Sequence, residues 1–208
     1  MTYFGNKENF AIAFELKKSP FNESEKREPS WGEFQMWVHN NSVCTFSMDD
    51  KIREYEWDLS FIVEWFYINK DYILEEIPFP LPCEGNNAIE LYNNSGDFDS
   101  DDDNEFNSWY EKRQDWYFTH SWYSNNGGSY LADVIFRRVN DTIEIAWDNT
   151  ELYDNIKYVN PKGVCYISVE LFQLVVDGFI EEFMNDISKS EEGKRIIQEI
   201  CGKTNQTK

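Results

Sequence analysis

Apolar and polar residues alternate in the first fifty residues in a way that predicts antiparallel strands. Residues 10–16 read FAIAFEL, and every second side chain is apolar and points to one face of a strand. A polar connection with two prolines covers residues 17–30, and residues 31–39 then show the same alternation. Asn40 and Asn41 predict a tight turn into a third strand over residues 42–48. Together these segments indicate a small antiparallel meander.

The apolar spacing changes to that of a helix between residues 59 and 76. Asp58 is a suitable N-cap, a break or bend is expected near Asn69, and Pro78 stops the helix. A second helix is predicted over residues 107–119, because Trp109, Trp116 and His120 recur on one of its faces.

The C-terminal part also contains both patterns, the alternation typical of strands and the apolar spacing typical of helices. Residues 130–147 predict a hairpin that turns at Asn140 and Asp141, after a loop over residues 124–129. A short strand precedes a helix over residues 168–187, and a last helix follows Ser190. The apolar stripe expected on the first of these helices contains Leu171, Leu174, Val175, Phe179 and Phe183. The predicted fold class is therefore α+β, with an antiparallel sheet packed against several helices.

The chain divides most simply at an acidic segment. The expected parts are an N-terminal α+β part over residues 1–92, an acidic flexible loop or linker over 93–106, and a C-terminal α+β part over 107–208. The alternative is a single domain that carries an acidic loop.

The charge balance excludes some classes of partner. The 208 residues carry 39 acidic and 19 basic side chains, for a net charge of −20, and 41% of them are hydrophobic. Phosphates and anionic lipids repel such a chain, so neither direct nucleic-acid binding nor membrane binding is expected. A basic protein partner remains compatible with this charge.

The cysteines and the N-terminus indicate a cytoplasmic protein. The four cysteines are far apart and form no CxxC pair, which favours reduced, buried thiols over a zinc site. No basic start followed by a long apolar run marks a signal peptide. No metal or cofactor is predicted, and no feature predicts the oligomeric state.

Residues 97–105 concentrate the negative charge. Six of these nine positions are acidic: Asp97, Asp99, Asp101, Asp102, Asp103 and Glu105. A helix–loop–helix calcium loop that starts at Asp97 would need glycine at Asp102 and glutamate at Ser108, so this interpretation fails. Self-repulsion favours a solvated tether that steers a basic partner. A nucleic-acid mimic is the alternative, and it would need further acids on ordered elements.

Catalytic patterns are sparse. His39 and His120 are the only histidines, and no nucleophile or phosphate-loop motif is present. Asp133 and Glu144 lie on consecutive predicted strands, but Ala146 stands where a metal nuclease needs lysine. Arg137 and Arg138 are expected to pair with nearby acids. A pocket with His120, Gly127, Gly128, Arg137 and Arg138 is the alternative site, for an enzyme or a small-ligand binder.

One segment has a recognisable pattern. Residues 120–147, HSWYSNNGGSYLADVIFRRVNDTIEIAW, resemble a segment of uncharacterised bacterial proteins from defence-type gene neighbourhoods. The shared features are a Trp/His helix end, a Gly-Gly loop, an Arg pair and a strand that ends in Trp. The resemblance implies a bacterial immunity, anti-phage or inhibitor setting, and it assigns no functional residue.

These observations predict a non-enzymatic acidic protein that binds a basic protein partner, as a bacterial inhibitor, immunity protein or antiviral defence component. Aromatic side chains anchor many protein interfaces. The expected contact residues are the six acids of residues 97–105 together with Trp109 and Tyr110.

Overall fold

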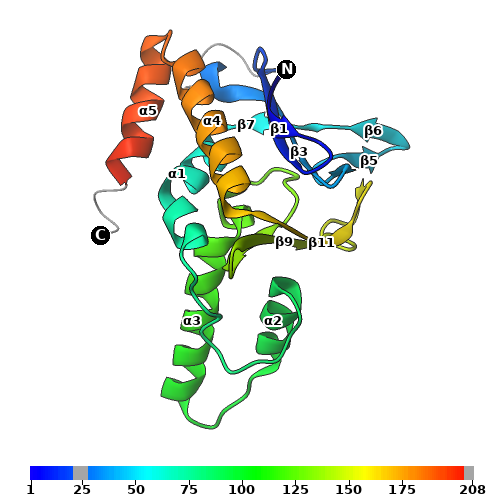
Figure 1. Cartoon of the computed structure of the whole chain (residues 1–208), viewed down its shortest axis with the longest axis vertical. Coiled ribbons are helices and arrows are strands. Elements are labelled where there is room, and N and C mark those ends of the chain that lie inside the picture. Colours follow the sequence, from blue (N-terminus) through cyan, green and yellow to red (C-terminus); the bar gives the residue numbers. More distant parts are fainter. Residues whose placement is uncertain (21–27, 204–208) are drawn as a thin grey trace.

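The computed structural model describes residues 1–20 and 28–203 (Figure 1). Its first sheet is antiparallel and runs in the order β1 (Thr2–Asn6), β2 (Phe10–Leu16), β3 (Trp31–Val38). The far edge of β3 pairs with β7 (Tyr55–Asp58) at one end and with β4 (Asn41–Ser42) at the other. The first two strands of the predicted meander are therefore confirmed, β1 is an additional edge strand, and only the two residues of β4 pair with β3 where a longer third strand was predicted.

The turn after β3 lies one residue earlier than the sequence pattern indicates. Trp37 pairs with Ser42 and Val38 with Asn41, so His39 and Asn40 are the two turn residues. Their φ angles are 47° and 65°. Such a turn needs two left-handed residues, and asparagine accepts that conformation readily.

The segment predicted as one strand over residues 42–48 is split in the structure. β5 (Phe46–Met48) leaves the first sheet and joins a small second sheet, in the order β10 (Lys157–Tyr158), β5, β6 (Lys51–Arg53). The β5–β6 hairpin projects from the side of the molecule (Figure 1).

The predicted C-terminal hairpin is confirmed. β8 (Ile135–Val139) pairs with β9 (Thr142–Asp148), and β11 (Lys162–Ser168) adds to the other side of β9. One face of this sheet presents Phe136 and Ile145 to the main core, while Ile135 and Ala146 lie in a second, smaller core. Because both faces of this sheet are covered, β8 and β9 contain more apolar residues than strands with one exposed face would.

The first helix, α1 (Ser60–Leu74), is continuous, and the break expected at Asn69 is absent. The buried amide of Asn69 donates to the Trp65 carbonyl oxygen at 3.0 Å, a bond that keeps this polar side chain within the helix. The N-cap of α1 is Leu59, so Asp58 lies one residue before the predicted cap position, although its carboxylate still accepts from the Ser60 backbone N–H at 3.0 Å. Helix α1 ends before Pro78, as the sequence predicts.

Two helices close the chain, α4 (Val169–Ile187) and α5 (Glu191–Lys203). Ser168 caps α4, as the sequence predicts, and the Ser190 hydroxyl accepts from the Gly193 backbone N–H at the start of α5. The predicted stripe on α4 is wrong at Leu174, which is 72% exposed. The buried face is centred on Phe172, Val176 and Ile180, because α4 packs between the first sheet and the third and buries a wider stripe.

One hydrophobic core contains residues from both ends of the chain, from Phe10 to Ile200. Phe66 of α1 lies within aromatic contact of Trp122, Phe136 and Phe172, with ring centroids 5.6 to 6.3 Å apart. The two parts expected on either side of residues 93–106 therefore share their core, which favours the single-domain alternative.

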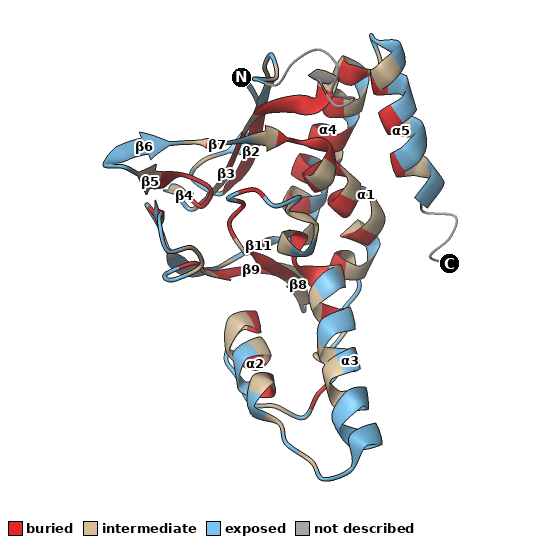
Figure 2. Cartoon of the chain, turned by 180° about the vertical axis from the view of Figure 1, so that it is seen from behind, coloured by how far each residue is buried: buried red, intermediate tan, exposed pale blue. Residues whose placement is uncertain are grey.

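Residues 88–120 form a helical arm that extends away from this core (Figures 1 and 2). It consists of α2 (Ala88–Asn94), a short 3-10 turn η2 (Ser95–Asp97), a connection, and the long helix α3 (Asp103–His120). A 3-10 turn η1 (Glu28–Ser30) precedes β3, and another, η3 (Trp122–Asn125), follows α3.

Candidate functional site: the acidic tip of the arm

An aromatic cluster fixes the base of the arm to the third sheet. Trp116 of α3 packs edge-to-face on Phe79 at 4.8 Å and belongs to the small core formed with Ile135 and Ala146. At the next position along α3, the Tyr117 hydroxyl donates to the carboxylate of Asp133 at 2.8 Å. Burial raises the pKa of the Asp133 carboxyl, although Ser121 and Tyr117 both donate to it. The base is therefore packed and hydrogen-bonded.

A buried carboxylate joins the same sheet to α2. Glu144 of β9 is fully buried and accepts from the Ala88 backbone N–H at 2.5 Å and from the Arg137 guanidinium at 2.8 Å. The Tyr166 hydroxyl also donates to it, at 3.2 Å. The expected internal pairing of Arg137 is confirmed. Asp133 and Glu144 are therefore both hydrogen-bonded within the fold, where they join the base of the arm to the third sheet.

The tip of the arm, residues 95–106, is held by contacts to α3. Phe98 stacks on Trp109 with centroids 4.0 Å apart, and the Trp109 indole N–H donates to the Ser95 carbonyl oxygen at 2.9 Å. The Tyr110 hydroxyl lies 2.7 Å from the Gly96 carbonyl oxygen and 3.0 Å from that of Phe98. These bonds fix the backbone of the tip at several points.

The tip therefore differs from the expected tether. Residues 93–94 end α2, residues 95–97 form η2, and residues 103–106 begin α3. Asp102 is the N-cap of α3, since its carboxylate accepts from the Asn104 backbone N–H at 2.8 Å. Acidic residues at a helix N-terminus are also stabilised by the helix dipole, which offsets part of their mutual repulsion. Mutual repulsion of the carboxylates therefore does not predict the backbone conformation of the tip.

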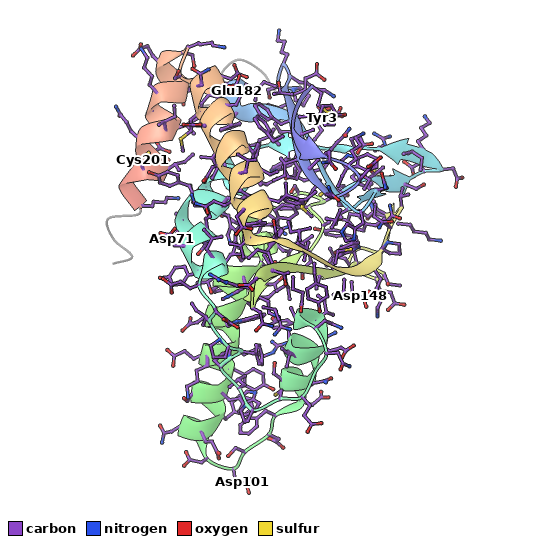
Figure 3. All side chains as sticks on the ribbon, viewed as in Figure 1. Tyr3, Asp71, Asp101, Asp148, Glu182 and Cys201 are labelled. Atoms are coloured by element: carbon purple, nitrogen blue, oxygen red, sulfur yellow. The ribbon has the colours of Figure 1, made fainter. Side chains whose placement is uncertain are left out.

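All six acids expected as contact residues are exposed at this tip. Asp101 lies at the far end of the arm (Figure 3). Trp109 and Tyr110, which the sequence predicts as exposed anchors, are half-buried and brace the tip. Phe106 is the aromatic residue that faces solvent, with 38% of its surface exposed. The tip is thus a convex acidic surface with one exposed ring.

Among the described residues, the six acids at the tip lie within nine positions and none is ion-paired, whereas the carboxylates of the body include both paired and unpaired groups. On the body of the molecule many carboxylates are paired: Glu33 and Glu56 with Lys17, Asp148 with Lys162, Asp177 with Lys70, and Glu191 with Lys194. Negative charge is therefore concentrated and unmatched at the end of the arm.

Metal-ligand groups, membrane spans and disulfides are not found in the part of the chain that the structure describes. No group of three or more His, Cys, Asp or Glu side chains there lies in an arrangement that could hold a metal ion. None of the helices in these ranges has the length and apolarity that a bilayer crossing requires. The four cysteines are unpaired, and only Cys44 is buried.

The residues of the alternative pocket do not come together. His120 lines a surface pocket of about 310 Å³, whose other lining residues include Tyr72, Pro78 and Lys112 but none of the other four. Gly127 has a φ of 63°, and a side chain there would clash with the ring of Phe61.

The other three residues predicted for this pocket, Gly128, Arg137 and Arg138, do not line it either. Gly128 has a φ of 80°, and a methyl group added there would meet no neighbour within 4 Å. Arg137 is paired with Glu144, but the expected pairing of Arg138 with a nearby acid is wrong within the described residues. Arg138 instead donates to the backbone carbonyls of Leu74 and Asn140 at 2.9 and 2.8 Å. The glycines and arginines therefore have structural roles in the turn and at the hairpin.

His120 is held as a neutral imidazole. Its ring stacks on Trp116 at 4.5 Å, and Nδ1 lies 2.8 Å from the Trp116 carbonyl oxygen. A carbonyl oxygen can only accept, so Nδ1 carries the proton. Burial lowers the pKa of His120 from 6.5 to about 4, and the nearby Arg137 charge acts in the same direction.

We expect this histidine to make the protein less stable in acid. Because the folded-state pKa is below the unfolded-state value, the unfolded chain takes up a proton first as the pH falls from about 6.5 to about 4. At about 1.4 kcal/mol per pKa unit, the loss approaches about 3 kcal/mol. Urea unfolding of the wild type and of His120→Phe across this window measures the difference. The exposed His39, changed to Asn, is the control and should leave the pH dependence in place; an unchanged slope in His120→Phe would contradict the assignment.

Two features of the arm are not predicted from the sequence. The N-cap of helix α2 is Asn87, whose side chain accepts from the Glu90 backbone N–H at 3.0 Å, while the Glu90 carboxylate accepts from the Asn86 backbone N–H at 2.8 Å. This reciprocal capping is visible as Asn followed three residues later by Glu. The second feature is the exposure of Phe106, which the spacing of apolar residues in the sequence does not indicate.

Comparison with protein-family models, with curated proteins and with solved structures found no match to this chain.

Proposed function

We propose that the arm is a recognition element whose acidic tip binds a basic surface on a partner protein. The observation that carries this proposal is the unmatched charge of six exposed carboxylates at the end of a braced projection. An ordered tip presents its charges at defined positions, which lowers the entropy cost of binding compared with a flexible tether.

The physics of association supports this role. A cluster of like charge that extends beyond the body attracts an oppositely charged protein before contact, and salt screens the attraction. Phe106 supplies an apolar contact within the acidic surface, where a ring can be desolvated on binding. In this proposal the protein acts without catalysis, in the bacterial cytoplasm, as an inhibitor, immunity or anti-phage defence component.

Two charge-matched variants test the proposal. The tip variant carries Asp97→Asn, Asp99→Asn, Asp101→Asn, Asp103→Asn and Glu105→Gln, and it keeps the Asp102 cap. The control variant removes the same number of charges from exposed carboxylates elsewhere on the described chain that have no side-chain partner: Asp71→Asn, Glu75→Gln, Glu151→Gln, Asp154→Asn and Glu181→Gln. Both variants therefore have the same net charge.

We expect affinity capture from the source cells to retain a basic protein with the wild type and the control variant, and to lose it with the tip variant. The association rate should fall steeply as salt rises. If duplex DNA displaces the partner, the basic surface is a nucleic-acid site, as a mimic would require. Equal retention by all three proteins, or an association rate that is independent of salt, would contradict the proposal.

A further inference from the structure

A second concave site lies on the body of the molecule and is lined in part by residues of the β5–β6 hairpin. This hairpin lies away from the tip of the arm (Figure 1). Its volume is about 500 Å³, within the range of small-molecule sites. It is lined by residues of β3, β5, β6 and β7 and by three residues from connections, Pro20, Glu54 and Tyr130. Most of its wall therefore comes from paired strands, and no residue of the arm contributes to it.

Aromatic side chains form most of the apolar wall. Trp31 and Trp57 are neighbours across the β3–β7 pair, with ring centroids 5.3 Å apart and planes inclined by 46°. On the hairpin side, Phe46 and Tyr130 have centroids 6.0 Å apart. Indole and phenol faces carry partial negative charge and attract cations.

The charged side chains that line the cleft are Glu33, Glu54, Glu56 and the exposed Arg53, and one of the three carboxylates has no cation as its partner. Glu33 and Glu56 share the ammonium group of Lys17, at 2.6 and 3.1 Å. The Trp31 indole N–H also donates to Glu56 at 3.0 Å, and it contributes most to the lowered pKa of that carboxyl. Glu54, in contrast, has no ion pair with any residue of the described ranges.

Glu54 is fixed in position by a neutral donor. The hydroxyl of the buried Thr45 donates to its carboxylate at 2.6 Å, which orients the group without neutralising it. A half-buried carboxylate beside aromatic faces is stabilised by a cation, and a weakly hydrated cation loses little hydration in such a site.

We propose that this cleft binds a quaternary ammonium compound, with Trp57 against its methyl groups and Glu54 facing its charge. The inference rests on the residues of the cleft alone, and it holds whether or not the tip binds a basic protein. Choline is the probe, and 3,3-dimethylbutan-1-ol, which has the same shape without the charge, is the matched neutral compound.

Titration calorimetry at constant ionic strength provides the test. We expect saturable choline binding that is at least about tenfold tighter than binding of the neutral alcohol. Glu54→Gln keeps an acceptor for Thr45 and should weaken choline binding about tenfold, and Trp57→Leu should weaken it by a similar factor, while Glu151→Gln should have no effect. Circular dichroism checks that each variant is folded.

Three results would overturn the inference: no saturable binding of choline to the folded wild type, equal binding of the neutral alcohol, or unchanged affinity in folded Glu54→Gln. Should Trp57→Leu fail to fold, Glu54→Gln and the two compounds still decide the question, because neither comparison changes the aromatic walls.

Discussion

Replacing Glu144 by alanine should lower the free energy of unfolding by about 3–5 kcal/mol, the usual cost of leaving a buried charge without its partner. The substitution leaves the Arg137 guanidinium and the Ala88 backbone N–H without the carboxylate that both contact. Arg137 has little compensation, because its Nε atom already lacks a partner within the described structure. Urea unfolding followed by circular dichroism measures the change.

A double-mutant cycle separates the ion pair from the general cost of truncation. Arg137→Ala in the Glu144→Ala background should be less destabilising than Arg137→Ala alone, since no unpaired charge is created. Glu170, an exposed acid near the start of α4, supplies the control when changed to alanine and should cost less than about 1 kcal/mol. A Glu144→Ala effect as small as this control would show that the pair does not hold α2 to the sheet.

The strands and long helices could be predicted from local patterns, because their causes are local. The Asn140 turn and the Ser168 cap of α4 depend on a few neighbouring residues, and the structure confirms both predictions. Helix α1 continues through Asn69 because the side chain finds an acceptor within its own helix. The prediction for Leu174 is wrong because the buried width of α4 depends on two sheets that come from distant parts of the chain.

The position of the candidate site could be predicted from the sequence, but its backbone could not. The concentration of carboxylates in residues 97–105 marks the tip correctly as an exposed acidic surface. The tip is ordered because Phe98 stacks on Trp109 and the Tyr110 hydroxyl contacts two carbonyl oxygens. The spacing of apolar residues in the sequence does not indicate these contacts. The aromatic cleft has no sequence signal at all, because its residues are brought together only by strand pairing and by the loop after η3.

The central claim is that position, and not only total charge, makes the tip attractive to a basic surface. An oligolysine peptide at low salt is a suitable probe, because its interaction with this protein is almost purely electrostatic. The wild type, the tip variant and the control variant are compared by titration calorimetry. Backbone amide NMR shifts then report which residues the peptide contacts.

We expect the largest shifts in the wild type and the control variant at residues 95–106, and an affinity about tenfold weaker in the tip variant alone, as a local cluster of charge requires. If the peptide instead shifts amides beside carboxylates over the whole surface, and the two charge-matched variants lose affinity equally, the tip has no special role and the proposed recognition site is wrong.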